Sequence, residues 1–103
     1  MGEVSSTSFH ESENLLRITG ELDSSTLEPF GERLQSFVAK TGHDFEIDIS
    51  EIQYVSSSFI GYLARALVDA KAKGCGVSIR TNTRVGRLLK VAGIDKLAPI
   101  IQG

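Results

Sequence analysis

A segment in the middle of the chain, Phe45-Glu46-Ile47-Asp48-Ile49, alternates strictly between apolar and acidic residues. Successive side chains of a β-strand point to opposite faces, so this period of two predicts a strand with one buried and one polar face. On both sides of it, apolar residues recur every three or four positions, which is the spacing of a helix with one buried stripe. The chain is therefore expected to build a sheet from strands that alternate with helices.

The remaining predicted elements follow the same two periods. Residues 5–19 favour a hairpin of two short strands, and residues 77–80 favour a further strand. The buried stripes of three helices are predicted to be Leu27, Phe30, Leu34, Phe37 and Val38; Ile60, Leu63, Leu67 and Ala70; and Val85, Leu88, Leu89 and Ala92. With 41% hydrophobic and 23% charged residues, the composition is that of a folded globular protein. We expect one α/β domain over residues 1–103, a mixed sheet of about four or five strands covered by helices.

Short polar side chains precede each predicted helix, as is usual for N-caps. Asp23, Ser24 or Ser25 is suited to cap the first helix, and Thr83 the third. Three consecutive serines, residues 56–58, precede the second helix. Backbone N–H groups and the helix dipole favour a phosphate at such a position, and a phosphoserine would add about −1.5 to −2 charges there. The serine cluster is thus a candidate modification site, although a polar turn with one N-cap would show the same residues.

Several classes of function are disfavoured by the composition. A formal net charge of −2 argues against a nucleic-acid binder, which usually carries a basic surface. Cys75, His10 and His43 form no clustered ligand set, so we expect neither a metal nor another cofactor. No nucleophile-elbow or Walker-type pattern surrounds the serines, so no catalytic residue is predicted and the chain is not expected to be an enzyme.

The chain is also expected to lack a membrane span. No apolar run approaches the roughly 20 residues that a membrane-spanning helix needs. The first six residues, Met1 to Ser6, lack the basic-then-apolar order of a signal peptide. We therefore expect a cytoplasmic protein.

Two neighbouring segments resemble the signature of the STAS family, the anti-sigma-factor antagonists of bacteria. Family members typically carry a strand that ends Asp-hydrophobic-Ser, then Asp-Ser-Ser/Thr-Gly-hydrophobic-Gly at the start of a helix; residues 48–52 and 55–61 are similar to these. Residues 20–23 resemble the family's Gly-x-Leu-Asp turn, and residues 87–94 resemble its last amphipathic helix with its glycine stop. The resemblance covers nearly the whole chain.

The resemblance also implies a set of site residues. Alignment on Gly61 places Ser57 and Ser58 on the family's two hydroxyl positions, and Ser58 on the one presented to a partner kinase. Ser58 is therefore the first choice for phosphorylation and Ser57 the second. Ser56 stands where an aspartate is usual, and Phe59 where a glycine is usual. The residues expected to contact a partner are Asp23, Asp48, Ser56, Ser57 and Phe59.

In the family, the unphosphorylated module binds an anti-sigma factor that is also a serine kinase. Phosphorylation by that kinase breaks the complex, and a protein phosphatase restores the module. The resemblance implies this partner switching here. The alternative is a STAS scaffold subunit without a phosphorylation cycle, in a stress-signalling or transporter-associated complex, and the unusual Ser56 and Phe59 favour it. The sequence leaves the oligomeric state and the controlled sigma factor open.

Structural alternatives remain for individual residues. Asp23 is equally suited to be a helix cap, and Asp48 to be the solvent-facing residue of an edge strand. Phe59 and Tyr62 fit either the core or an exposed aromatic contact patch, and exposure of Phe59 would favour the contact. A basic stripe is predicted along the third helix, suited to an acidic partner or a phosphate, or else simply solvated. Its residues are Arg80, Arg84, Arg87 and Lys90.

Overall fold

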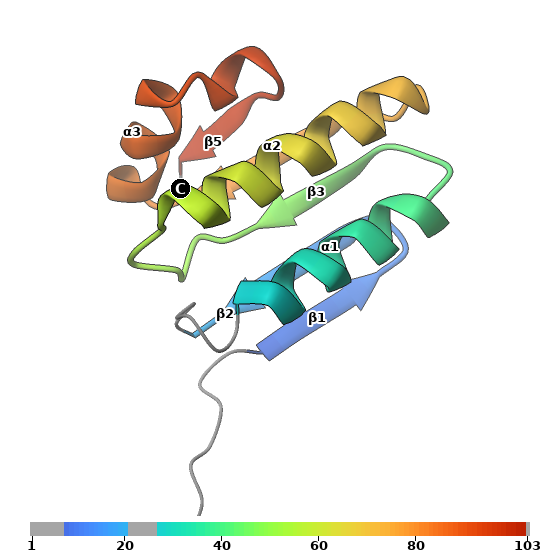
Figure 1. Ribbon diagram of the computed structural model, residues 1–103, viewed down its shortest axis with the longest axis horizontal. Helices are drawn as coiled ribbons and strands as arrows, with labels where there is room; N and C mark the ends of the chain where they lie inside the picture. Colours follow the sequence, from blue (N-terminus) through green and yellow to red (C-terminus); the bar gives the residue numbers. More distant parts are fainter. Residues whose placement is uncertain (1–7, 21–26, 103) are drawn as a thin grey trace, which may run out of the picture.

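The computed structural model describes residues 8–20 and 27–102 of the chain (Figure 1). Its elements, in chain order, are β1 (Ser8–Ser12), β2 (Leu15–Thr19), α1 (Leu27–Lys40), β3 (Phe45–Asp48), α2 (Ser57–Ala72), β4 (Val77–Thr81), α3 (Thr83–Val91), a short 3-10 helix (Ile94–Lys96) and β5 (Ile100–Gln102). The predicted opening hairpin and the alternation of helices with strands are confirmed. The proposed caps of the first helix, Asp23, Ser24 and Ser25, lie outside the described residues.

The strands form one mixed sheet in the order β1-β2-β3-β4-β5. β1 pairs antiparallel with β2, with Phe9 opposite Ile18, and the other three pairings are parallel. β3 therefore lies at the centre of the sheet, not at an edge. The alternative that placed Asp48 on an edge strand is therefore wrong, because two strands lie on each side of β3.

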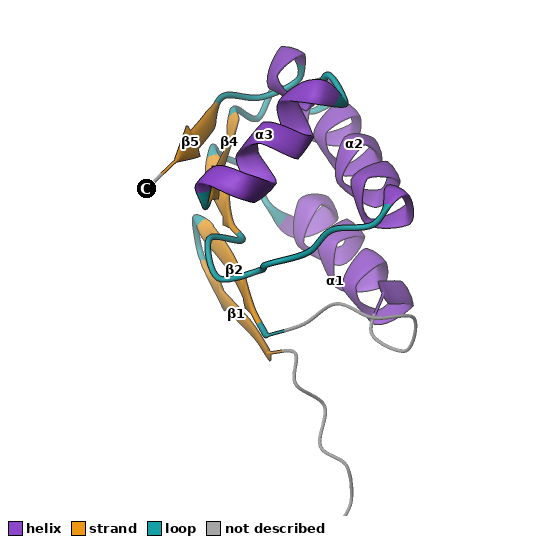
Figure 2. Cartoon of the chain, turned by 90° about the vertical axis from the view of Figure 1, so that its left-hand side faces the viewer, coloured by secondary structure: helices purple, strands orange, loops and turns teal. Residues whose placement is uncertain are grey.

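The helices cover a single face of this sheet. From β2 to β5 each crossover steps in the same direction, and right-handed crossovers of that kind place their helices on the same side. Figure 2 shows α1, α2 and α3 together on one side of the strands. The other face carries the polar side chains of the alternating strands. The parallel strands end on the same side of the molecule on which α2 begins (Figure 1). The serine cluster lies at this end of the strands, because it forms the start of α2.

The core lies between the sheet and the helices. Phe45 and Ile47 of the central strand and Ile49 directly after it are all buried, as their alternation predicts. Aromatic rings join the layers, since Phe37 of α1 lies edge-on to Phe45 with ring centroids 5.0 Å apart. The helix residues that fill this layer include Phe30, Leu34, Phe37, Val38, Leu63, Leu67, Ala70, Val85 and Leu89.

The third helix buries only half of its predicted stripe. Val85 and Leu89 are buried, but Leu88 is 42% exposed and Ala92 is also exposed. Gly86 accounts for the difference, because a Cβ added there would lie 2.6 Å from Thr81 Oγ1 on β4. The backbone of α3 approaches the sheet along the glycine side, which turns Leu88 outward.

Glycines follow the ends of α2 and α3, and a lysine joins the end of α2 to the end of α1. Gly74 follows α2 and Gly93 follows α3, with φ of +80° and +84°, in the left-handed region that favours glycine. Lys73, at the end of α2, donates from Nζ to the carbonyl oxygens of Val38 at 2.6 Å and Thr41 at 2.7 Å. Since these carbonyls lie at the end of α1, the lysine ties α2 to α1.

Within the described residues, no helix has the length and apolar character needed to cross a membrane.

Candidate partner-binding site

The three serines at the start of α2 occupy different positions. Ser56 is the N-cap, with extended backbone at φ −97° and ψ 170°, and its Oγ accepts a hydrogen bond of 3.1 Å from the N–H of Phe59. Ser57 and Ser58 are the first two residues of the helix, and both are exposed. The prediction that this cluster begins a helix is confirmed. One serine stabilises the helix end, and two lie at the surface.

Phe59 belongs to the core and not to the contact surface. Its side chain is 0% exposed, and its ring stacks on Phe30 of α1 with centroids 4.7 Å apart and an interplanar angle of 21°. The burial criterion therefore decides against Phe59 as a contact residue. The helical spacing of Phe59 from Leu63 and Ala66 signals this burial. Of the two alternatives for Phe59, the core is the one that the structure supports. Tyr62 is 36% exposed, and its ring also lies edge-on to Phe30.

Asp48 organises the turn that leads from β3 to the serines. Its Oδ1 accepts hydrogen bonds from the N–H of Ser50 at 2.9 Å and from Ser50 Oγ at 2.7 Å. An aspartate that bonds the backbone two residues ahead forms an Asx turn, which replaces lost strand pairing at a strand end. Only 13% of its side chain is exposed. Asp48 thus shapes the start of the loop and offers little surface for a direct contact.

Asn82, which the sequence reasoning passed over, holds the same loop from the other side. Its Nδ2 donates to the carbonyl oxygens of Ser50 at 3.2 Å and Ile52 at 2.8 Å. Its Oδ1 accepts from the N–H of Val85 at 2.8 Å. Asn82 is therefore the N-cap of α3, and the assignment of the cap to Thr83 was wrong by one residue. The high N-cap preference of asparagine was the available signal.

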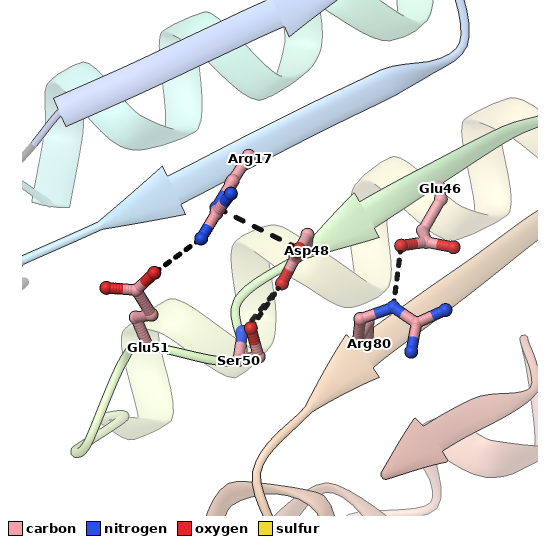
Figure 3. Close-up of polar contacts among 6 residues, drawn as sticks. All are labelled: Arg17, Glu46, Asp48, Ser50, Glu51 and Arg80. Carbon is pink, nitrogen blue, oxygen red and sulfur yellow. Dashed lines mark hydrogen bonds and ion pairs between the residues drawn. The ribbon is translucent and has the colours of Figure 1, made fainter. Parts of the chain in front are cut away.

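A ladder of charged side chains extends over the uncovered face of the sheet beside this loop (Figure 3). Arg17 of β2 pairs with Glu51 in the loop and lies 4.0 Å from Asp48. Arg80 of β4 donates from Nε to Glu46 of β3 at 3.0 Å. The register places Asp48 of β3 opposite Arg17 of β2 and opposite Arg80 of β4, and the Arg80 side chain bonds to Glu46, two residues before Asp48 on β3. The charges therefore alternate in sign across the three strands.

Arg80 belongs to this charge ladder and not to the basic stripe predicted along the third helix. The hydrogen bond with Glu46 and its charge raise the pKa of Arg80, with a smaller contribution from the charge of Asp48. Arg80 points toward Glu46 (Figure 3). The remaining cations of the predicted stripe, Arg84, Arg87 and Lys90, lie on α3 and are exposed.

The histidine contacts of the described residues involve no serine. His43 Nδ1 lies 3.3 Å from the carbonyl oxygen of Asp44, and its Nε2 lies 3.7 Å from Glu13. Across residues 8–20 and 27–102, no three histidine, cysteine or acidic side chains gather into a group that would hold a metal ion. Asp23, which the family resemblance adds to the contact set, lies outside the described residues.

Comparisons with known proteins agree with this architecture. A family model described as "Mlab, STAS domain" matches residues 5–102. The crystal structure of an anti-sigma factor antagonist from Mycobacterium paratuberculosis is similar, with a TM-score of 0.75 and 20% identity over 94% of this chain and 85% of that one. A putative anti-sigma factor antagonist from Thermotoga maritima matches with a TM-score of 0.75 and 15% identity, over 94% and 86%. The family match spans nearly all of the sequence, and the chain belongs to the STAS domain family.

Proposed function

We propose that this protein is a bacterial, cytoplasmic anti-sigma-factor antagonist that works by partner switching. In its unmodified form, the surface at the start of α2 binds an anti-sigma factor with serine kinase activity. Phosphorylation at Ser58 releases that partner, and a protein phosphatase restores binding. The proposed role is binding rather than catalysis; the polar contacts of the His43 ring in the described residues are with Asp44 and Glu13.

The observation that carries this proposal is that the side chains of residues 56–59 occupy different environments: one caps the helix, one is in the core and two are exposed. Ser56 uses its hydroxyl to cap α2, and Phe59 directs its ring into the core, so neither covers Ser58. Ser58 is exposed in the first helical turn. The phenylalanine that replaces the family's usual glycine therefore leaves the surface around the hydroxyl open. Ser57 and Ser58 are therefore the serines of this turn whose hydroxyls a kinase could reach.

Electrostatics supports a change in binding without a change in folding. A phosphate on the first turn lies near the positive end of the helix dipole, which favours the negative charge by about 0.3–1 kcal/mol at an exposed position. The same group adds about −1.5 to −2 charges to a surface that a partner must desolvate. The helix is thus expected to tolerate the modification while the interface does not.

The test begins with protein isolated from the native cells. Mass spectrometry should find phosphate at Ser58, and affinity capture with the unmodified chain should recover an anti-sigma factor kinase. Ser58→Asp is expected to weaken binding of that kinase at least about tenfold, which corresponds to about 1.4 kcal/mol, with an unchanged thermal midpoint. Ser36→Asp, an exposed serine of α1, is the matched control and should bind normally. Full-strength binding by Ser58→Asp, or its unfolding, would contradict the proposal.

A second candidate function is a STAS scaffold subunit without phosphorylation. The family model's description as Mlab and the replacement of the usual aspartate and glycine by Ser56 and Phe59 favour it. In that case the native protein carries no phosphate at Ser57 or Ser58. Capture then recovers a stable stress-signalling or transporter-associated complex that Ser58→Ala leaves intact.

A further inference from the structure

The outward side of α3 carries apolar and basic residues in one continuous row. Arg84, Arg87, Leu88 and Val91 follow the spacing i, i+3, i+4, i+7, which places them on the same side of a helix. We call these four residues the α3 stripe. Val91 is 83% exposed, the highest value among the exposed large hydrophobic residues of the described structure, and Leu88 is 42% exposed. Exposed apolar side chains that adjoin each other on one helix mark a surface suited to a partner.

The α3 stripe also lies on a helix that is basic throughout. α3 contains Arg84, Arg87 and Lys90 and no acidic residue, although the whole chain has a net charge of −2. Among the described residues, no carboxylate lies within 4.0 Å of these three cations. The other arginines of the chain differ, because each of them pairs with an acid: Arg17, Arg33, Arg65 and Arg80.

A shallow, open depression lies on the stripe itself. A hollow of about 500 Å³ is lined by Thr83, Arg84, Arg87 and Leu88. It offers space for an apolar side chain, with two guanidinium groups at its border. Guanidinium groups bind carboxylates through two parallel hydrogen bonds, which gives such a border a preference for glutamate or aspartate.

We propose that the α3 stripe is a docking surface for an acidic amphipathic helix of another protein. The apolar side of that helix packs on Leu88 and Val91, and its carboxylates pair with Arg84 and Arg87. This docking surface goes beyond the serine switch, since it involves a different element and needs no modification of Ser58. Charge complementarity identifies the occupant: a row of cations without neighbouring acids fits a partner that supplies acids at helical spacing.

An anionic membrane is the other surface that cations attract, and the structure disfavours it. Basic clusters that hold proteins at lipid surfaces usually carry about 4–8 lysines and arginines, and amphipathic membrane helices bury a long apolar face. α3 has nine residues, with three cations and two exposed large apolar side chains. A protein helix that also fills the hollow matches this small, mixed surface better.

The experiment uses the full chain and a synthetic peptide as the probe. The peptide is an amphipathic helix of about 18 residues, long enough to be helical in isolation, with glutamates on one face and leucines on the other. A peptide with lysine in place of every glutamate is its control. Fluorescence anisotropy gives the affinity, and amide chemical shifts locate the binding surface. The acidic peptide is expected to bind along α3, more weakly as salt rises, and the lysine peptide is not.

Two double variants separate the stripe from exposed apolar and basic residues in general. Arg87→Glu with Val91→Ser is expected to weaken peptide binding at least about tenfold. The matched control, Lys71→Glu with Val68→Ser, changes one exposed cation and one exposed valine of α2 and should bind within about twofold of the original chain. Circular dichroism confirms that both variants are folded. Ser58→Asp should bind the peptide normally, so a failure of this proposal and a failure of the serine switch give different results.

Several outcomes would overturn the docking surface. Equal loss of binding in both double variants would show that the stripe has no special role. Equal binding of the lysine peptide would refute charge complementarity. Binding to vesicles of phosphatidylcholine and phosphatidylglycerol without binding of the acidic peptide would assign the stripe to a membrane. Self-association in sedimentation equilibrium that Arg87→Glu with Val91→Ser abolishes would assign it to a second copy of the chain.

Discussion

Replacement of Phe59 by alanine is expected to lower the free energy of unfolding by about 3–5 kcal/mol. The residue has no exposed surface, and its ring stacks on Phe30 between α1 and α2. A buried aromatic side chain withdraws about 150–250 Å² from water, worth about 4–6 kcal/mol at about 25 cal/mol per Å². That area is an upper estimate, because the unfolded chain already buries part of it. Measured Phe→Ala changes in protein cores fall at about 3–5 kcal/mol.

Urea denaturation followed by far-UV circular dichroism measures this change. The chain has no tryptophan, so the helical signal is the better probe. For a domain of this size each kcal/mol moves the thermal midpoint by about 4–8 °C, so the loss is easily resolved. Tyr54→Ala is the control, since Tyr54 is 69% exposed in the loop before the serines, and it should change stability by less than about 0.5 kcal/mol. A loss below about 1 kcal/mol for Phe59→Ala would refute the placement of the ring in the core.

Substitutions at Asn82, Gly86 and Gly61 test the loop and the packing. Asn82→Ala removes a helix cap and two loop hydrogen bonds and should lower the free energy of unfolding by about 2–3 kcal/mol. Asn82→Ser keeps a capping oxygen and should lower it less. In both variants, amide exchange in residues 50–56 should accelerate. Gly86→Ala should destabilise by about 1 kcal/mol or more in denaturant titration, because the new Cβ meets the fully buried Thr81 and overpacking outweighs the gain in helix propensity. Gly61→Ala on α2, with no atom within 4 Å of the added Cβ, should instead stabilise by about 0.5–1 kcal/mol. Equal effects at the two glycines would contradict the described contact between α3 and β4.

Strands β2, β3 and β4 and the first two helices were predictable because burial repeats locally along them. The period of two in residues 45–49 and the helical spacing from Phe30 to Val38 each depend on neighbours a few positions away. The buried face of α3 was not predictable in this way. Val85 with Leu89, and Leu88 with Ala92, both have the spacing of a buried stripe, and the close approach at Gly86 to Thr81 decides between them. That contact is set by tertiary packing.

The candidate site shows the same limit. Three serines before an apolar stripe indicate a helix start, and the structure has one there. The role of Asp48 depends on the register of three strands, which the sequence does not display. Asn82 acts on carbonyl oxygens about 30 positions earlier in the chain. Such long-range hydrogen bonds have no local pattern from which they can be predicted.

The charge ladder on the uncovered sheet face also bears on how the protein can evolve. Arg80 and Glu46 neutralise each other across neighbouring strands, and Asp48 adds a further acid beside the arginine. Loss of Arg80 alone would leave Glu46 without the cation it pairs with, two residues from a second acid, Asp48, on the same strand. Positions 46 and 80 are therefore expected to change together among relatives, through neutral side chains or by a reversal of both signs.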